Sequence, residues 1–195
     1  MELKNARIGV GLTGSFCTFA DTFAALAKLK ERCASLTFVL SYHVQTLSCR
    51  FTTPDETLRE CRELSDVQPI LTIPDAEPLG PKNKLDLFLI APCTGNTLAK
   101  LAHGITDTPV LMAAKGHLRG GKPLVLAVAS NDALSANMTN IGTLMRSKNI
   151  YFVPLTQDSP AGKPFSLVAD LAQLTDTVAA ALKGKQIQPI LHPGL

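Results

Sequence analysis

The chain alternates between short apolar runs and segments in which apolar residues recur every three or four positions. The short runs are rich in aliphatic and β-branched residues, as strands buried on both faces are. They lie at residues 8–12, 36–41, 85–92, 123–129 and 150–154. Because helical spacing follows these runs, the pattern predicts βαβ units. We therefore expect an α/β fold, a three-layer doubly wound parallel sheet of Rossmann-like type.

The segments between the runs carry apolar stripes that would face such a sheet. Stripes of this kind predict helices over residues 19–33, 98–102, 134–147 and 167–182. The sequence Thr-Pro-Asp-Glu at 53–56 has the form of a capping box with proline at the first helical position, which predicts a further helix ending near Leu64. Residues 68–74 are a candidate strand, and residues 76–84, rich in proline and charge, are predicted to form a surface loop.

Nothing in the sequence repeats or marks a second domain. Residues 1–184 are predicted to form one α/β domain, and residues 185–195 an extended C-terminal tail with two prolines and no helical period. The tail is either a loose end or an arm that packs on a neighbouring protomer.

Composition narrows the class of protein further. Of the 195 residues 46% are hydrophobic, and the formal net charge of +3 is spread along the chain without a basic run, which argues against nucleic acid as a partner. The first residues lack the apolar h-region of a signal peptide, and no stretch reaches the roughly 18 apolar residues that a membrane span requires, so neither is expected. Five cysteines without a CxxC pair favour reduced thiols and a cytoplasmic location, and four scattered histidines predict no metal site.

Small polar residues gather where the predicted strands end. In an open parallel sheet these ends share one edge, and ligands bind there between loops and helix starts. Glycine lets the backbone approach a ligand, and amide N–H groups and hydroxyls can bind an anion without a lysine. We therefore predict a cofactor-binding site formed by Thr13, Gly14, Ser15, Phe16, Ser41, Pro92, Thr94, Asn96, Thr97, Ser130 and Asn131.

Two observations limit this prediction. Ser, Thr and Asn are also the residues that helix N-caps prefer, so each junction taken singly is explained as a cap. Gly9, Gly11 and Gly14 spell GxGxxG between a strand and a helix, but Ser41 stands where a dinucleotide site has an acidic residue. The pattern therefore disfavours NAD on this chain and favours a mononucleotide phosphate held between Gly14, Ser15 and Ser41.

At these residues the sequence resembles the flavoprotein family that includes the peptidyl-cysteine decarboxylases and the flavin prenyltransferases. The segment "LTGS" (12–15) resembles the first phosphate loop of that family. The segment "APCTGNT" (91–97) resembles the family sequence Pro-Ala-Ser-Ala-Asn-Thr, with Pro92, Asn96 and Thr97 kept. The resemblance implies a flavoprotein fold, FMN as cofactor, and Asn96 as a residue that orients the flavin ring or the substrate.

Longer segments, residues 76–119, 130–160 and 184–191, are similar to one branch of this family, the B subunits of dipicolinate synthases. That resemblance implies one component of an oxidoreductase in the mother-cell cytoplasm of a spore-forming bacterium, which oxidises dihydrodipicolinate to dipicolinate with NADP. It also implies a partner, the A subunit, which carries its own dinucleotide-binding domain. Relatives assemble as homo-oligomers, and the same is expected here.

A small dicarboxylate substrate requires cations or oriented N–H groups. Lys115, His117, Arg119 and Lys122 lie in one segment whose glycines predict a mobile loop. We therefore predict Lys115 and His117, together with Asn96, as the catalytic residues. The alternative is that this segment is a solvated basic loop.

Two departures from the family bear on activity. The segment "SNDALSANM" (130–138) stands where the decarboxylases carry Pro-x-Met-Asn, and Ser130-Asn131 stand where the prenyltransferases carry Arg-Glu. Both differences argue against those activities and leave flavin or phosphate binding open. Two alternatives to an oxidoreductase role remain: a non-catalytic scaffold or substrate-delivery protein with a vestigial flavin pocket, and a flavin-dependent decarboxylase.

Overall fold

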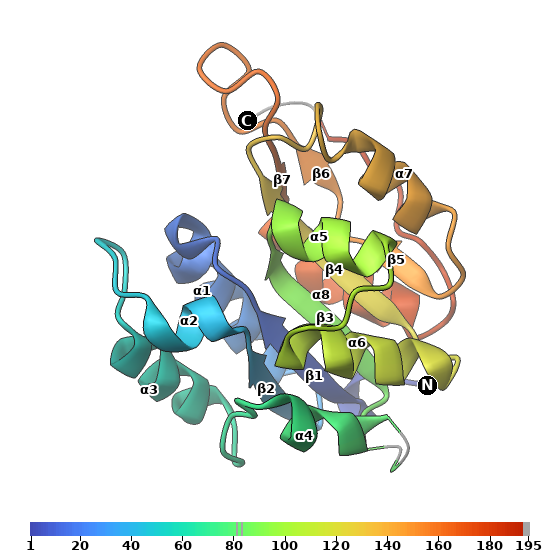
Figure 1. Cartoon of the computed structure of the whole chain (residues 1–195). Coiled ribbons are helices and arrows are strands. Elements are labelled where there is room, and N and C mark those ends of the chain that lie inside the picture. The colour runs from blue at the N-terminus through green and yellow to red at the C-terminus, as the bar shows by residue number, and fades with distance from the viewer. Residues whose placement is uncertain (81, 83, 193–195) are drawn as a thin grey trace.

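A seven-stranded sheet runs through the centre of the molecule (Figure 1). The computed structural model describes residues 1–80, 82 and 84–192. Four long strands run parallel in the order β2-β1-β3-β4, and β5 is parallel to the first half of β4. These strands are β1 (Arg7–Leu12), β2 (Ser35–Leu40), β3 (Leu87–Cys93), β4 (Leu124–Ser130) and β5 (Ile150–Phe152). The predicted α/β class with a mostly parallel sheet is confirmed.

Two short strands extend the sheet beside the second half of β4. In antiparallel pairing, β7 (Leu167–Ala169) binds the end of β4, and β6 (Leu155–Thr156) binds β7. The sheet is therefore mixed and not wholly parallel. After β5 the chain forms a hairpin of β6 and β7, and a hairpin connection makes its two strands antiparallel.

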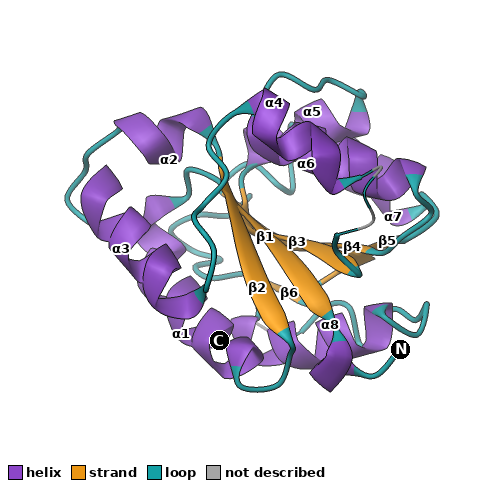
Figure 2. Cartoon of the chain, turned by 90° about the horizontal axis from the view of Figure 1, so that it is seen from below, coloured by secondary structure: helices purple, strands orange, loops and turns teal. Residues whose placement is uncertain are grey.

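Helices cover both faces of the sheet, as Figure 2 shows. On one face lie α1 (Phe19–Lys30), α3 (Pro54–Leu64) and α8 (Leu174–Ala181). On the other lie α4 (Ile73–Ala76), α5 (Gly95–Ala102), α6 (Pro109–Arg119) and α7 (Met138–Met145). The short α2 (Tyr42–Thr46) follows β2 and contacts α3. None of these helices is long and apolar enough to span a bilayer, within the part of the chain that the structure describes.

Each face of the sheet has its own buried core. Leu26, Phe38 and Val178 pack on the α1 side, and Phe88 and Phe152 pack on the α6 side. Complete burial of a side chain of this kind stabilises the fold by about 1.5–3 kcal/mol. Every residue of β3 and β4 is buried, which explains why these strands are nearly continuous apolar runs in the sequence. The predicted three-layer arrangement is confirmed.

The local signals for α3 act as the sequence predicts. The Thr53 Oγ1 accepts a hydrogen bond from the Glu56 amide at 3.3 Å, and the Glu56 carboxylate accepts one from the Thr53 amide at 2.7 Å. This reciprocal capping box, followed by proline, begins a helix that ends at Leu64.

The prediction of a strand at residues 68–74 is wrong. Ile70 forms only an isolated bridge with Val39, and the chain then turns into α4. The Thr72 hydroxyl caps that helix by accepting a hydrogen bond from the Asp75 amide at 3.2 Å. Pro74, which ends the predicted strand, therefore lies in the first turn of a helix. The predicted loop at 76–84 contains a 3₁₀ helix over Glu77–Leu79; residues 81 and 83 lie outside the described residues.

The predicted C-terminal helix begins later than its apolar spacing indicates. Leu167 belongs to β7, a 3₁₀ helix follows over Leu171–Gln173, and α8 starts only at Leu174. The residues before α7 are likewise turns, so that helix starts at Met138 and not near 134. Apolar residues before α8, such as Leu167 in β7, happen to match the helical spacing. Periodicity alone therefore cannot show where the helix begins.

The C-terminal tail packs against its own chain. The Gln186 side chain forms two hydrogen bonds with the backbone of Phe152: it accepts one from the amide at 2.8 Å and donates one to the carbonyl at 2.7 Å. Leu155 then bonds through its amide to the Ile190 carbonyl and through its carbonyl to the His192 amide, both at 2.8 Å. Residues 186–192 are therefore not a loose end, because they are bonded to β5 and β6 of the same molecule. Residues 193–195 lie outside the described residues.

Candidate functional site

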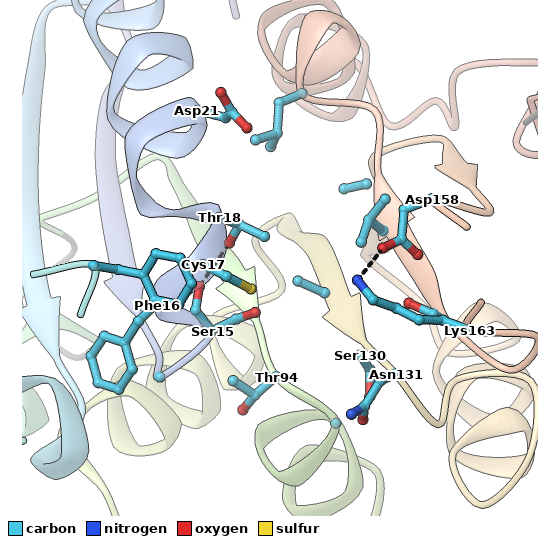
Figure 3. A pocket seen from close by; sticks show the side chains of 18 of the residues that line it. Ser15, Phe16, Cys17, Thr18, Asp21, Thr94, Ser130, Asn131, Asp158 and Lys163 are labelled. Atoms are coloured by element: carbon cyan, nitrogen blue, oxygen red, sulfur yellow. Dashed lines mark hydrogen bonds and ion pairs between the residues drawn. The ribbon is translucent and has the colours of Figure 1, made fainter. Parts of the chain in front are cut away.

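A pocket of about 960 Å³ opens at the edge of the sheet where β3 and β4 end (Figure 3). One side is the loop and 3₁₀ helix at residues 14–18, which follow β1. The floor is formed by Thr94 and Gly95 after β3 and by the end of β4, and the opposite side is the β6–β7 hairpin. Sites for small molecules and cofactors are typically concave spaces of roughly 300–1,000 Å³.

Thr13 joins the ends of β1 and β3 beneath this pocket. Its hydroxyl donates to the Pro92 carbonyl at 2.7 Å and accepts from the Thr94 amide at 3.0 Å. Thr94 in turn caps α5, because its hydroxyl accepts from the Thr97 amide at 3.3 Å. Thr13, Pro92 and Thr97 thus fix the start of α5 relative to the loop after β1.

The loop after β1 is a tight turn held by its own backbone. The Ser15 amide donates to the Thr13 carbonyl at 2.8 Å, and the Ser15 carbonyl accepts from both the amide and the hydroxyl of Thr18, at 3.1 and 2.9 Å. Figure 3 shows Ser15 and Cys17 facing Lys163 across the pocket. The turn therefore presents small polar groups to the ligand space.

A hydrogen-bonded cluster of polar side chains lies at the end of β4. The Ser130 hydroxyl donates to Asp132, and the Asn137 amide group donates to both Asp132 carboxylate oxygens at 2.9 and 3.0 Å. The Asn140 amide group donates to the Asn137 side-chain oxygen at 2.9 Å. The Ser130 hydroxyl, and then Asn137, hold the pKa of Asp132 below its ordinary value against the opposing effect of burial. Asp132 is therefore an ionised carboxylate at neutral pH.

The hairpin side of the pocket carries charge. Lys163 is paired with Asp158 at 2.9 Å, and His192 Nδ1 lies 3.0 Å from Asp170. Burial raises the pKa of Asp158, but the Lys163 ammonium and the Ser166 hydroxyl outweigh it and leave that pKa below its ordinary value. Among the described lining residues Lys163 is the only lysine or arginine, against the carboxylates of Asp21, Asp158 and Asp170.

The structure brings part of the predicted cofactor site into one space. Both the prediction and the pocket contain Gly14, Ser15, Phe16, Thr94, Ser130 and Asn131. Ser41 lies beside Thr13 at the end of β2, outside the pocket lining, and is more than nine-tenths buried. Its hydroxyl has no hydrogen-bond partner among the described residues. Asn96 is exposed on the first turn of α5 and does not line the pocket.

Lys115 and His117 lie outside the pocket lining, and the prediction that their segment is a mobile loop is wrong. Both belong to α6, which runs through Gly116 and packs closely on Gly80: a Cβ on Gly80 would lie 2.8 Å from the Gly116 carbonyl oxygen. His117 is 3% exposed, with Nε2 3.0 Å from the carbonyl of Pro123, where β4 is about to begin. Burial lowers the pKa of His117 to about 4. Lys115 is exposed and also outside the pocket lining.

The sequence patterns did not reveal the hairpin wall or the side chains of Cys17, Asp21 and Phe51. The sequence does contain a signal for the hairpin. Between Leu155 and Leu167 lies a stretch with prolines and a glycine, which is typical of a turn between two short strands. No signal pointed to its position over the ends of β3 and β4, because that position depends on pairing between residues far apart in the chain. No group of His, Cys, Asp and Glu in the described part of the chain could hold a metal ion.

The fold and the site define an α/β protein of the flavoprotein class. A family model described as Flavoprotein matches residues 1–183, and the chain belongs to that family. The resemblance carried by "LTGS" and "APCTGNT" is thereby confirmed.

Within the family the chain is similar to the B subunit of dipicolinate synthase from Bacillus subtilis (strain 168), with 45% identity over 190 residues, 97% of this chain and 95% of that protein. The crystal structure of the corresponding B subunit from Bacillus halodurans C is 42% identical and superposes with a TM-score of 0.91 over 100% of both chains. A dodecameric FMN-dependent Ubix-like decarboxylase from Escherichia coli O157:H7 is 25% identical, with a TM-score of 0.67 over 92% of this chain and 97% of that one.

Proposed function

We propose that this chain is the B subunit of a dipicolinate synthase and that its pocket holds FMN. With the A subunit of that enzyme as its partner, it takes part in the NADP-linked oxidation of dihydrodipicolinate to dipicolinate. The observation that carries the proposal is a pocket of about 960 Å³ at the strand ends of a chain that, along nearly its whole length, is 45% identical to a dipicolinate synthase B subunit.

The residues present fit a flavin mononucleotide. The pocket lining contains the Ser15 hydroxyl and the backbone of the glycine-containing turn at the end of β1, a donor set that suits a phosphate. The buried Ser41 hydroxyl, which lacks a partner among the described residues, lies beside Thr13 just outside that lining. FMN supplies a group that accepts a hydride. No lysine or arginine is needed for the phosphate, since hydroxyls and backbone N–H groups bind anions in such loops.

In this proposal the protein mainly positions its ligands. Oxidation of a dihydropyridine removes a hydride and a proton, and the aromatic product is favoured, so alignment of the reacting groups is the main requirement. Thr13 and the Thr94 cap hold the ends of β1 and β3 in register for this purpose. The hairpin forms the wall opposite the loop after β1 and bounds the space in which the ligands would be aligned.

One observation favours the alternative of a scaffold or delivery protein. The carboxylates of Asp21, Asp158 and Asp170 outnumber the single Lys163 in the described pocket wall, and Lys163 is already paired with Asp158. A dicarboxylate would be repelled by such a surface unless cations came from elsewhere. In this alternative the dicarboxylate is held by the A subunit, which the present chain stabilises or supplies with substrate.

The experiment that tests the proposal is purification of the chain alone and in complex with the A subunit. A yellow preparation with flavin absorbance, together with NADP reduction that requires dihydrodipicolinate and both proteins, supports the oxidoreductase role. A colourless chain that binds no added FMN and still raises the turnover of its partner supports the scaffold. A chain that neither binds flavin nor changes that turnover contradicts both.

We also propose that the chain forms a homo-oligomer in the cytoplasm of the mother cell of a spore-forming bacterium. The E. coli decarboxylase of the same family is dodecameric, which supports assembly in this family. Light scattering of the purified chain tests it: a monomer at micromolar concentration would overturn the assembly.

A further inference from the structure

Ser130 is the last residue of β4 and forms part of the pocket floor. It is 9% exposed, so its hydroxyl has contact with the pocket and little with bulk solvent. Its one hydrogen is given to the Asp132 carboxylate. The direction of that bond determines what Ser130 can do toward a ligand.

The direction is fixed by the neighbours of Asp132. An ionised carboxylate only accepts hydrogen bonds, so the hydrogen between the two residues must come from Ser130. Asn140 donates to the Asn137 side-chain oxygen, and this turns the Asn137 amide group toward both oxygens of Asp132, at 2.9 and 3.0 Å. The carboxylate is thus held by donors on both oxygens and cannot exchange roles with Ser130.

The cluster also has little room to rearrange. Gly95, the first residue of α5, lies directly against it: a Cβ there would lie 2.6 Å from the Asn137 amide nitrogen and 2.9 Å from an Asp132 oxygen. The cluster is therefore pressed between the start of α5 and the start of α7. A ligand meets Ser130 in one fixed orientation.

We propose that Ser130, held by Asp132, is a specificity-determining hydrogen-bond acceptor for an N–H group of a heterocyclic ligand. Its hydroxyl presents only lone pairs to the pocket, which attract an N–H donor and repel an anionic oxygen. The proposal rests on the proposed flavin binding, because the imide N–H of a flavin ring is a donor of this kind.

The same arrangement orients FMN. Neighbouring strands lie about 4.8 Å apart, so the end of β4 is on the order of 12 Å from the gap between β1 and β2. The negative charge of Asp132 disfavours phosphate at the β4 end, whereas the Ser15 hydroxyl and the turn after β1 accommodate it at the opposite end of the pocket. The phosphate therefore lies at the turn after β1, and the ring extends toward Ser130.

The test compares FMN with 3-methyl-FMN, in which a methyl group replaces the imide hydrogen, by titration of flavin fluorescence with the apo chain. Wild type is expected to prefer FMN by about tenfold, equivalent to about 1.4 kcal/mol. In Ser130→Ala the preference disappears. In Asp132→Asn, which has the size of the wild-type residue, Ser130 is free to donate, and the preference falls below about threefold. Ser147→Ala, a serine whose hydroxyl only bonds within its own helix end, keeps the wild-type preference.

The outcomes separate this inference from the function on which it rests. Equal binding of the two flavins by wild type overturns the role of Ser130 and leaves FMN binding standing. An undiminished preference in Asp132→Asn also overturns it, because steric exclusion of the methyl group would then account for the difference. Failure of wild type to bind either flavin overturns the proposed FMN site itself. The wild-type comparison requires no variant to fold.

Discussion

At the scale of single residues, the pocket separates its hydrogen-bond donors from its acceptors. The end of β1 offers the Ser15 hydroxyl, while the end of β4 offers Ser130 backed by the Asp132 charge. Residue types at strand ends predicted six of the residues that line this pocket, because the carboxyl ends of neighbouring parallel strands meet at one edge of the sheet, although each junction singly is also explained by helix capping. They could not predict Asp132, since its role depends on a side-chain network that forms only in the fold.

Ser15→Asp tests the phosphate end of the site. A carboxylate at this position would face the phosphate of FMN at close range with little screening, so FMN affinity should fall by at least about 100-fold, equivalent to about 2.7 kcal/mol. Fluorescence titration of the apo variant measures the loss. Ser147→Asp, which adds the same charge far along the chain at the end of α7, should bind FMN as wild type does. Equal affinity of the two variants would place the phosphate elsewhere.

At the scale of elements, close backbone contacts decide where helices run. Gly80, which has no Cβ, lets α6 pass closely at Gly116, and a segment with three glycines and four basic residues is mostly helix and not a loop. The sequence showed the glycines but not the contact, which joins residues far apart in the chain. Capping signals at Thr53 were sufficient for α3 because both partners lie within one turn.

Gly95→Ala should disrupt the junction between α5 and the cluster at the end of β4. The added methyl group would overlap Asn137 and Asp132, and overpacking of this kind destabilises proteins by about 1–3 kcal/mol. Gly142→Ala in α7 is the matched control: no atom lies within 4 Å of its Cβ position, so it should be neutral or stabilise by up to roughly 1 kcal/mol. Urea unfolding of both variants measures the difference, and equal midpoints would contradict the tight packing at Gly95.

At the scale of the whole molecule, fold and site were not equally predictable. Five apolar runs correctly predicted the three-layer arrangement, because a strand buried on both faces of a parallel sheet is a continuous run of apolar residues in the sequence. The pocket wall at 155–170 left only the turn-rich stretch of the hairpin as a signal, since β6 and β7 are too short for a period. Their place depends on the pairing of β7 with β4 and of β6 with β7. Lys115 and His117 were chosen for their chemistry, but the fold assigns His117 to the core.

That buried histidine makes the stability of the whole molecule depend on pH. The pKa of His117 is about 4 in the folded chain and near 6.5 when unfolded, so between these values the unfolded state binds more protons. Stability should therefore be intact above about pH 6.5 and fall as the pH is lowered toward 4, by up to roughly 3 kcal/mol. Urea unfolding at several pH values should give a shallower slope for His117→Gln than for wild type. The exposed His103→Gln should keep the wild-type slope, and an equal slope in all three proteins would contradict this origin.

The hydrogen bonds of residues 186–192 with the backbone of Phe152 and Leu155 have a consequence for biosynthesis. Residues 186–192 leave the ribosome after β5 and β6, so the backbone groups of Phe152 and Leu155 are satisfied only once that segment has emerged. A nascent chain that stops short of residue 186 therefore holds its hairpin by the β6–β7 and β4–β7 pairing alone.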